Sequence, residues 1–436
     1  MKWIKLFIPV LAIAMIFSGC SFRLASSVDE LIAPVAPAGD NADVQSALDS
    51  YCKGSFSLKT PVGGEYTTSY IFYDIDTDGQ EEAIAFYEPA SNLGTINMAV
   101  IDKVDNQWTV ISNVVGDGSD IYSVDFADLN GDGLIEFVVL WDVISNSSNH
   151  VLSVYSQEKE SGDSIKRIGK EITTNDYIVV DIDNDGINEV MMFTIDAGDS
   201  IVAYANLYSY SKGNSKLIAR TKLDGHIISY KNIISETVNG NVYVYADAIN
   251  LNGSQMHTEV IYWSKNYDSI ISPFYNYSTG VTKNTIRNTM LTSRDINQDG
   301  YVEIPLDATI EGLPTYIEAV NWKQYKGSVL DHVSYSIAVQ RDDYQIIIPD
   351  KYFDKISVAY DSQNSLLTIS DKNKQMIVSI MSVLKAHYDE NSSNYDDYIQ
   401  IMNNSGYIYL AKVNEESDIK LTTDDLKSMI KSYKGE

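Results

Sequence analysis

Cysteine, proline and basic residues are scarce in this chain. Its 436 residues include two cysteines, Cys20 and Cys52, and nine prolines. Two cysteines exclude a small scaffold held together by several disulfides. Only 32 lysines and arginines face 60 acidic residues, which gives a formal net charge of −28. Such a surface repels phosphates, so nucleic acid and anionic lipid are excluded as partners.

Sequence motifs of common enzyme families are also missing. The chain has no His-Glu-x-x-His, no Gly-x-Ser-x-Gly, no P-loop and no dinucleotide-binding glycine pattern. The five histidines are scattered without ligand spacing: His150, His226, His257, His332 and His387. A glycosidase needs only two well-placed carboxylates, and spacing cannot identify such a pair among 60 acids. Asp142 and Asp307 follow apolar segments and are candidates for exposed acids, or else solvated turn residues.

One acidic loop recurs four times. Its copies begin at Asp74, Asp128, Asp181 and Asp295, which lie 54, 53 and 114 residues apart, so the last gap is about two periods. A repeat of this length indicates a solenoid or a propeller. Because β-solenoid repeats are usually much shorter and about four short strands fit in each period, we favour the propeller.

The composition of the loop favours Ca²⁺. Positions 1, 3 and 5 offer side-chain oxygens, position 6 is glycine and position 9 is glutamate, a set of hard ligands around a sharp turn. An EF-hand would need an acid at position 12, where this chain has apolar residues. An ordinary Asp-Gly or Asn-Gly hairpin is the alternative. The predicted ligands for about four Ca²⁺ ions are Asp74, Asp76, Asp78, Glu82, Asp128, Asn130, Asp132, Glu136, Asp181, Asp183, Asp185, Glu189, Asp295, Asn297, Asp299 and Glu303.

Each loop is followed by an apolar segment, so we expect it to join two strands. These segments are Ala83 to Tyr87, Phe137 to Trp141, Val190 to Phe193 and Ile304 to Leu306. The long gap contains a degenerate fifth copy with Ser235, Thr237, Asn239-Gly240 and Tyr243 at the corresponding positions. We expect a turn and a strand there, no metal, and five consecutive blades in all.

The four loops resemble the Asp-x-Asp-x-Asp-Gly-x-x-Asp/Glu loops of FG-GAP/VCBS repeats, which are found in integrin-alpha-type β-propellers. The resemblance implies a mainly β chain with a propeller of about five blades over residues 46–329. It also implies that the acids at positions 1, 3, 5 and 9 hold calcium at the edge of a blade.

The N-terminus is similar to a bacterial lipoprotein signal. Lys2 and Lys5 precede an apolar run from Leu6 to Phe17, and Ser18-Gly19-Cys20 ends it with small residues before the cysteine. The resemblance implies a signal peptide over residues 1–19 and a lipidated Cys20 at the extracytoplasmic face of the cell membrane. An ordinary secretory signal or a membrane-spanning anchor is the alternative, although the run is short for a span. Residues 20–45 are expected to be a flexible spacer.

After residue 329 the pattern changes, and we expect residues 330–436 to form a small α+β domain. Its predicted strands are Val333 to Val339, Tyr344 to Ile348, Ile356 to Tyr360, Leu366 to Ser370, Met376 to Ser382 and Tyr407 to Val413. A helix is predicted from Asp424 to Tyr433, with Thr422 or Thr423 as its N-cap.

Two functions remain open. The first is a non-enzymatic binding or adhesion module for an extracellular protein or glycan, with Trp108, Trp141, Trp263, Trp322 and nearby tyrosines as a candidate aromatic platform. These aromatics also suit packing between blades. The second is a carbohydrate-active hydrolase or lyase on a propeller scaffold, which would show acids converging away from the calcium loops.

Overall fold

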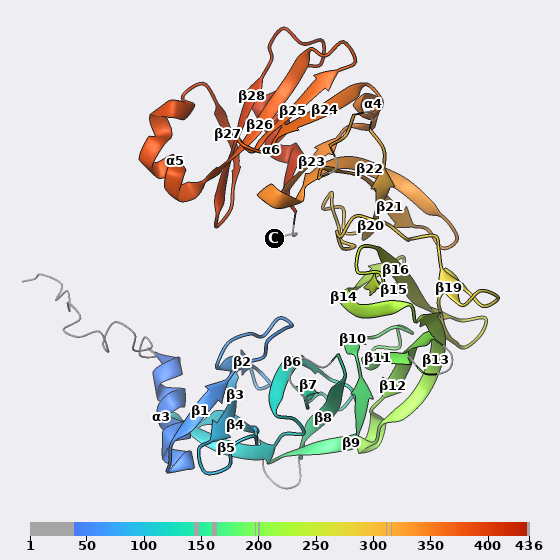
Figure 1. Ribbon diagram of the computed structural model, residues 1–436. Helices are drawn as coiled ribbons and strands as arrows, with labels where there is room; N and C mark the ends of the chain where they lie inside the picture. The colour runs from blue at the N-terminus through green and yellow to red at the C-terminus, as the bar shows by residue number, and fades with distance from the viewer. Residues whose placement is uncertain are drawn as a thin grey trace, which may run out of the picture.

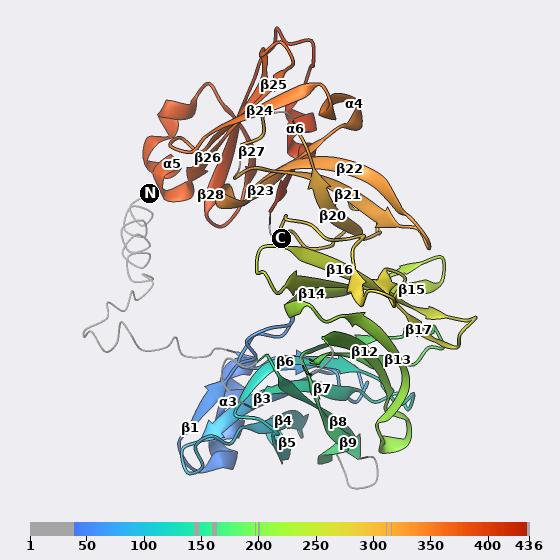
Figure 2. The same ribbon diagram turned by 45° about the vertical axis from the view of Figure 1, so that its right-hand side comes forward.

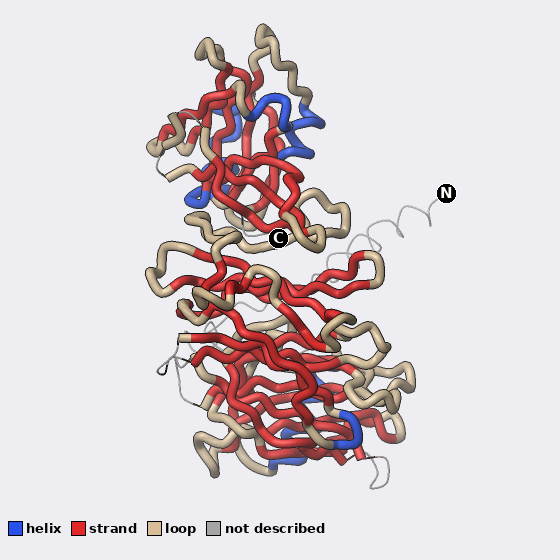
Figure 3. The backbone as a smooth tube through the Cα atoms, turned by 90° about the vertical axis from the view of Figure 1, so that its right-hand side faces the viewer, coloured by secondary structure: helices blue, strands red, loops and turns tan. Residues whose placement is uncertain are grey.

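The computed structural model describes residues 39–433 apart from residues 144–147, 159–163, 197, 199–200, 311 and 315. The chain is mainly β, as the sequence predicts, and strands make up most of its path (Figure 3). Six antiparallel sheets of four or five strands follow one another along an open arc, so that the first and last sheets lie at opposite ends (Figures 1 and 2). Closure into a five-bladed propeller therefore stays a prediction.

The chain enters sheet 1 through helix α3 (Asp40–Cys52), in agreement with the short helical pattern of the sequence from Val44 to Tyr51. The helix begins inside the predicted spacer, because Val44 and Leu48 lie one turn apart and are fully buried against the sheet. The signal peptide, Cys20 and the rest of the spacer lie outside the described residues. Sheet 1 consists of β1 (Phe56–Lys59), β2 (Ile71–Tyr73), β3 (Glu82–Pro89), β4 (Asn97–Val104) and β5 (Gln107–Val115).

Sheets 2 and 3 repeat the same plan, with four strands paired in the order of the sequence. Sheet 2 consists of β6 (Asp120–Ala127), β7 (Glu136–Asp142), β8 (His150–Glu158) and β9 (Ser164–Thr174). Sheet 3 consists of β10 (Asp176–Val180), β11 (Glu189–Asp196), β12 (Val202–Ser209) and β13 (Lys216–Asp224), with the short helix η1 (Ser211–Gly213) before its last strand.

Sheet 4 keeps the plan but lacks an acidic loop. Its strands are β14 (Ile227–Val238), β15 (Asn241–Asn250), β16 (Met256–Ser264) and β17 (Ser269–Ile271). The expected turn and strand are present, but Ser235 and Thr237 lie in β14 rather than in a loop. The first two strands are joined by Asn239-Gly240 alone, both with positive φ (50° and 75°), as a two-residue hairpin requires. A small ribbon follows, β18 (Tyr275–Asn276) paired with β19 (Val281–Thr282).

Sheets 5 and 6 carry the C-terminal part of the chain. Sheet 5 consists of β20 (Glu303–Ala308), β21 (Glu318–Tyr325), β22 (Leu330–Val339), β23 (Tyr344–Ile348) and β29 (Ile430–Ser432). Sheet 6 consists of β24 (Ile356–Asp361), β25 (Leu366–Asp371), β26 (Met376–Leu384), β27 (Ile399–Asn403) and β28 (Tyr407–Val413). The helical segments here are η2 (Gln340–Asp342), α4 (Asp350–Phe353), α5 (Lys385–Asn391), η3 (Ser392–Tyr395) and α6 (Thr423–Met429).

All six strands predicted for this part are present. The junction expected between residues 329 and 330 falls in the turn between β21 and β22, which are paired neighbours in sheet 5. Thr422 caps α6 in a capping box with Asp425, as predicted. The helix ends at Met429 rather than Tyr433, because Ile430 to Ser432 pair with β23 and bury Ile430.

Neighbouring sheets share apolar cores, to which each acidic loop contributes its second residue. Ile75, Leu129, Ile182 and Ile296 are at most 4 % exposed. Ile75 joins a cluster with Phe137 of sheet 2, and Leu129 joins one with Val190 of sheet 3. Ile182 likewise joins a cluster that includes Val244 of sheet 4, whereas Ile296 packs within sheet 5. The first three loops are therefore anchored between their own sheet and the next.

We predict that Gly225→Ala destabilises the junction between sheets 3 and 4. A Cβ at Gly225 would lie 2.4–2.5 Å from backbone atoms of Val202, which cannot retreat as a flexible side chain would. Such overpacking costs about 1–3 kcal/mol, so thermal or urea unfolding should show a clear loss of stability. Gly54→Ala is the matched control, because its nearest neighbour is 3.8 Å away. Equal stability of both variants would contradict the tight junction.

Candidate metal centres

The four acidic loops occupy equivalent places in the fold. In sheets 1, 2 and 3 each loop joins the first repeat strand to the second, from β2 to β3, β6 to β7 and β10 to β11. In sheet 5 the first strand is reduced to a bridge between Arg294 and Glu303, after which β20 begins. The predicted connection of two strands is confirmed for the first three loops, whereas the fourth joins a single bridge residue to β20.

Their backbone conformation is the same in all four copies. The glycines at position 6 have φ between 86° and 92°, a region that side chains avoid. Position 4 is also left-handed, with φ of 62° at Thr77, 75° at Gly131, 62° at Asn184 and 64° at Gln298. Three non-glycine residues in this region carry conformational strain. The loop is therefore a specific structure and not a simple two-residue turn.

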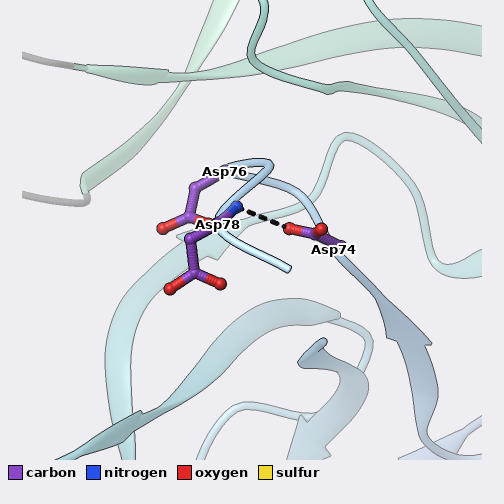
Figure 4. Close-up of side chains that lie close together, drawn as sticks. All are labelled: Asp74, Asp76 and Asp78. Carbon is purple, nitrogen blue, oxygen red and sulfur yellow. Dashed lines mark hydrogen bonds between the residues drawn. The ribbon is translucent and has the colours of Figure 1, made fainter. Parts of the chain in front are cut away.

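Carboxylates hold this conformation through backbone hydrogen bonds. The aspartate at position 1 accepts the N–H of the position 6 glycine at 2.7–3.0 Å in every loop. At position 5, a carboxylate oxygen accepts the N–H of position 7 at 2.8–3.0 Å. Figure 4 shows Asp74, Asp76 and Asp78 gathered around the tip of the first loop.

The glutamate at position 9 is the buried member of each set. Glu82, Glu136, Glu189 and Glu303 are at most 4 % exposed and begin the second strand. Each accepts the N–H of position 2 at 2.8–3.3 Å, which closes the loop across its base. The sequence motif thus folds into a ring of oxygens with one carboxylate in the protein interior.

Electrostatics at these glutamates favour a cation. Burial, together with the negative charges of neighbouring loop aspartates, raises the pKa of Glu82 to about 7 and those of Glu189 and Glu303 to about 8. The pKa of Glu136 is also raised, mainly by burial. A buried carboxylate is costly unless it is neutralised. A cation held by the same oxygens would supply the missing charge.

The four loops differ in how well their acids already converge. One carboxylate oxygen from each of Asp74, Asp76 and Asp78 lies within 4.8 Å of the others, and the same holds for Asp181, Asp183 and Glu189. Glu82 of the first loop and Asp185 of the third loop are not members of these groups of three. In the fourth loop, Oε1 of Glu303 is buried without a hydrogen-bond partner among the described residues.

The second loop satisfies its glutamate differently. Oε1 of Glu136 accepts hydrogen bonds from Asn130 Nδ2 at 2.9 Å and Ser156 Oγ at 2.8 Å. Its carboxylate is therefore already supported by neutral donors. All four donor sets consist of carboxylate and amide oxygens, which suit Ca²⁺ and suit Zn²⁺ poorly. The first and third loops, in which three acids already converge, fit Ca²⁺ best.

Loops of adjacent sheets also contact each other. The N–H of Ile135 in the second loop donates to the carbonyl of Ile75 in the first at 2.9 Å, and Thr77 Oγ1 donates to the carbonyl of Gly133 at 3.1 Å. In the fourth loop, the N–H of Val302 donates to the carboxylate of Glu236 in sheet 4 at 2.6 Å. The loops therefore fasten one sheet to the next.

The structure shows the surroundings of the other residues that the sequence singles out. Trp141 and Trp322 are fully buried, so they cannot belong to an exposed platform. Asp307 accepts backbone N–H groups of Asn288 and Thr289 and is occupied by that role. Burial raises the pKa of Cys52, which does not favour a reactive thiolate.

Asp142 is different, because it lies 2.5 Å from His150 at the far ends of the strands of sheet 2. A buried glutamate in sheet 4, Glu236, was missed by the sequence analysis because it lies outside the loop pattern. It accepts hydrogen bonds from the Tyr245 hydroxyl and from Val302.

The fold and its sites define a class: a series of antiparallel sheets that share apolar cores, four of which carry an acidic, oxygen-lined loop. Comparison with protein families and with characterised proteins identifies no relative, since no family model and no curated sequence matches the chain.

We predict that Glu189→Gln has opposite effects with and without calcium. With chelator, the variant should melt higher than the parent at pH 9. Burial and the loop aspartates raise the pKa of Glu189 from 4.5 to about 8 in the folded protein, so below about 4.5 the carboxyl is neutral in both the folded and the unfolded states. Its stabilising contribution is fully present there and is lost as the pH rises through about 8. At pH 5 the two should melt alike. In Ca²⁺ the variant should lose one bound ion by isothermal titration calorimetry.

Glu236→Gln is the matched control, since it alters a buried glutamate in the sheet without an acidic loop. Its ion count should equal that of the parent. For a dissociation constant of about 10⁻⁴ M, each site contributes about 1.4 kcal/mol at about 1 mM Ca²⁺. A melting temperature that is the same in chelator and in millimolar Ca²⁺ would contradict the metal centres.

Proposed function

We propose that this protein is a lipid-anchored, extracytoplasmic binding module whose FG-GAP/VCBS-type loops hold Ca²⁺ and fasten a propeller-like series of sheets. Its partner is an extracellular protein or glycan. The observation that carries the proposal is the repeated loop, with the same left-handed backbone at positions 4 and 6 and the same buried glutamate in four copies. Metal at such loops stabilises the scaffold and leaves the remaining surface for recognition.

The contacts between loops support this division of roles. They join sheet 1 to sheet 2 and sheet 4 to sheet 5 at the loop end of the strands. Calcium bound there would hold neighbouring sheets in one orientation, which pre-organises any surface built from several sheets. Loss of calcium would loosen that surface without removing any of its residues.

Anchoring rests on the N-terminal segment. Within the described part of the chain, no helix is long and apolar enough to cross a membrane. The proposed anchor is the acylated Cys20, which precedes the folded sheets and would hold them at the membrane surface.

A carbohydrate-active hydrolase or lyase is the second candidate, and one observation favours it. Asp120, Asp142 and Asp176 line one cavity away from the acidic loops. Acids converging in this way are what a glycosidase needs. Release of reducing ends from polysaccharides tests this candidate, and substrate binding without product supports the binding module.

The proposed function predicts calcium-dependent recognition. Full-length protein in detergent should bind a subset of an extracellular glycan and protein array in 1 mM Ca²⁺. In excess chelator, binding should fall at least several-fold because the sheets lose the calcium ions that hold them in one orientation. Restoring Ca²⁺ should restore it. Array binding that is the same in chelator and Ca²⁺ would argue against a calcium-organised surface.

Acylation is predicted at one cysteine only. In a bacterial host fed an alkyne fatty acid, the parent protein should be labelled and found with membranes. Cys20→Ala should abolish the label and release the protein from the membrane fraction. Cys52→Ala is the matched control and should behave like the parent, since Cys52 lies in the folded helix α3. Labelling of the Cys20→Ala variant would refute the anchor.

A further inference from the structure

A cavity of about 470 Å³ opens where the first strands of sheets 2, 3 and 4 begin. Six of the residues around it are Asp120, Tyr122, Asp142, His150, Asp176 and Tyr230. Asp120 starts β6, Asp142 ends β7 and Asp176 starts β10, whereas the acidic loops leave β6 and β10 at their other ends. The cavity and the calcium loops therefore lie at opposite ends of the same strands. Its volume suits a small molecule or a single side chain.

The strand register places Asp120, Asp142 and His150 next to one another across β6, β7 and β8. Asp120 pairs with Asp142 across β6 and β7, and Asp142 pairs with His150 across β7 and β8. Directly paired residues project from the same face of a sheet, and paired like charges are destabilising. Asp142 has a side-chain hydrogen-bond partner in His150, whose Nδ1 lies 2.5 Å from its Oδ1. Among the described residues, Asp120 has no such side-chain partner.

Asp120 and Asp176 keep unused acceptors. One oxygen of Asp120 accepts the N–H of Ile121 at 3.0 Å, and one oxygen of Asp176 accepts the N–H of Tyr177 at 2.8 Å. Their second oxygens have no donor within the described residues, and no lysine or arginine is among the residues that line the cavity. Burial, more than the nearby charge of Asp125, raises the pKa of Asp176 to about 6.

Tyr230 adds an independent sign of a ligand. Its side chain is 9 % exposed and its hydroxyl is buried with no hydrogen-bond partner among the described residues. Burial raises its pKa well above the usual range, so the hydroxyl stays protonated. Phe193 holds the ring, with 4.9 Å between ring centroids. An unpaired buried hydroxyl destabilises the folded protein, and a ligand that accepts from it or donates to it removes that cost.

We propose that this cavity binds the primary ammonium group of an organic ligand. Such a group has three N–H donors, which the free oxygens of Asp120 and Asp176 and the hydroxyl of Tyr230 can accept. The ring of Tyr122, whose centroid lies 4.4 Å from that of His150, adds an aromatic face that attracts cations. The inference rests on the proposed binding function and names the chemistry of its ligand.

The observations favour an organic cation over a bare metal ion. Within the described residues, the acids and histidine of the cavity do not form a group of three ligand atoms within 4.8 Å, whereas two of the acidic loops do. A neutral sugar would leave the charges of Asp120 and Asp176 without a counter-charge. An ammonium group supplies that charge and matches the strong negative charge of the whole chain.

Titration with cadaverine tests the proposal in full-length protein saturated with Ca²⁺, and 1,5-pentanediol serves as the neutral analogue. Cadaverine should bind at least ten-fold more tightly than the diol. A second arm compares the peptide acetyl-Gly-Lys-Gly-amide with its norleucine analogue. Binding of cadaverine without binding of the lysine peptide points to a free amine ligand, and binding of the lysine peptide points to a side chain of a protein partner. Failure of both, or equal binding of the diol, would overturn the proposal.

Variants separate the cavity from general charge attraction. Asp176→Asn should weaken cadaverine binding about ten-fold or more, whereas Asp105→Asn should leave it within about two-fold although it removes the same charge. Asp105 is an exposed hairpin residue with φ of 51°, a conformation that asparagine tolerates. Equal losses in the two variants would show that only net charge matters.

Tyr230→Phe gives an effect that a merely structural residue would not show. The variant loses an unpaired hydroxyl, so its melting temperature should equal or exceed that of the parent. Its affinity for cadaverine should nevertheless fall about three- to ten-fold. Unchanged affinity would overturn the role of the hydroxyl. In the same samples, a melting temperature raised by Ca²⁺ with no cadaverine binding rejects this inference alone, whereas no effect of Ca²⁺ rejects the proposed function.

Discussion

The organisation of this protein depends on one costly interaction, a glutamate carboxylate buried at the start of the second strand in four of its sheets. Each of these carboxylates accepts the N–H of the loop's second residue and so closes the loop. That second residue is apolar and buried, and in the first three loops it packs between adjacent sheets. A charge in the interior must be neutralised or paired. The same group therefore shapes the loop, positions the neighbouring sheet and creates the demand for a cation.

Sheet 4 is connected to the next sheet by a different kind of contact. It has no acidic loop, yet it is still tied to sheet 5, because Glu236 accepts the Val302 N–H and the Tyr245 hydroxyl. Between sheets 1 and 2 the equivalent hydrogen bond joins two backbone groups, since the N–H of Ile135 donates to the carbonyl of Ile75. The connection between neighbours is thus retained while its chemistry changes. We infer that calcium reinforces an architecture whose common requirement is the contact between sheets.

The two ends of the strands carry different features of the molecule. The strained, oxygen-lined loops lie at one end, where hydrogen bonds to the next sheet hold them. At the other end, side chains from sheets 2, 3 and 4 surround a cavity with unused acceptors. Its shape depends on the relative orientation of three sheets. A change in the loops would therefore reach the cavity through the sheets themselves, without direct contact.

Features that nine consecutive residues can build are readable from the amino-acid sequence. Asp181 to Glu189 contain their own turn, their own hydrogen bonds and the start of β11, and no distant partner is needed to recognise them. The capping box at Thr422 is local in the same way. Only the tertiary structure decided the open arc, the strand at Ile430 and the role of Glu236. The cavity also belongs to this group, because the register of three sheets brings Asp142, His150 and Tyr230 together and no spacing along the chain records it.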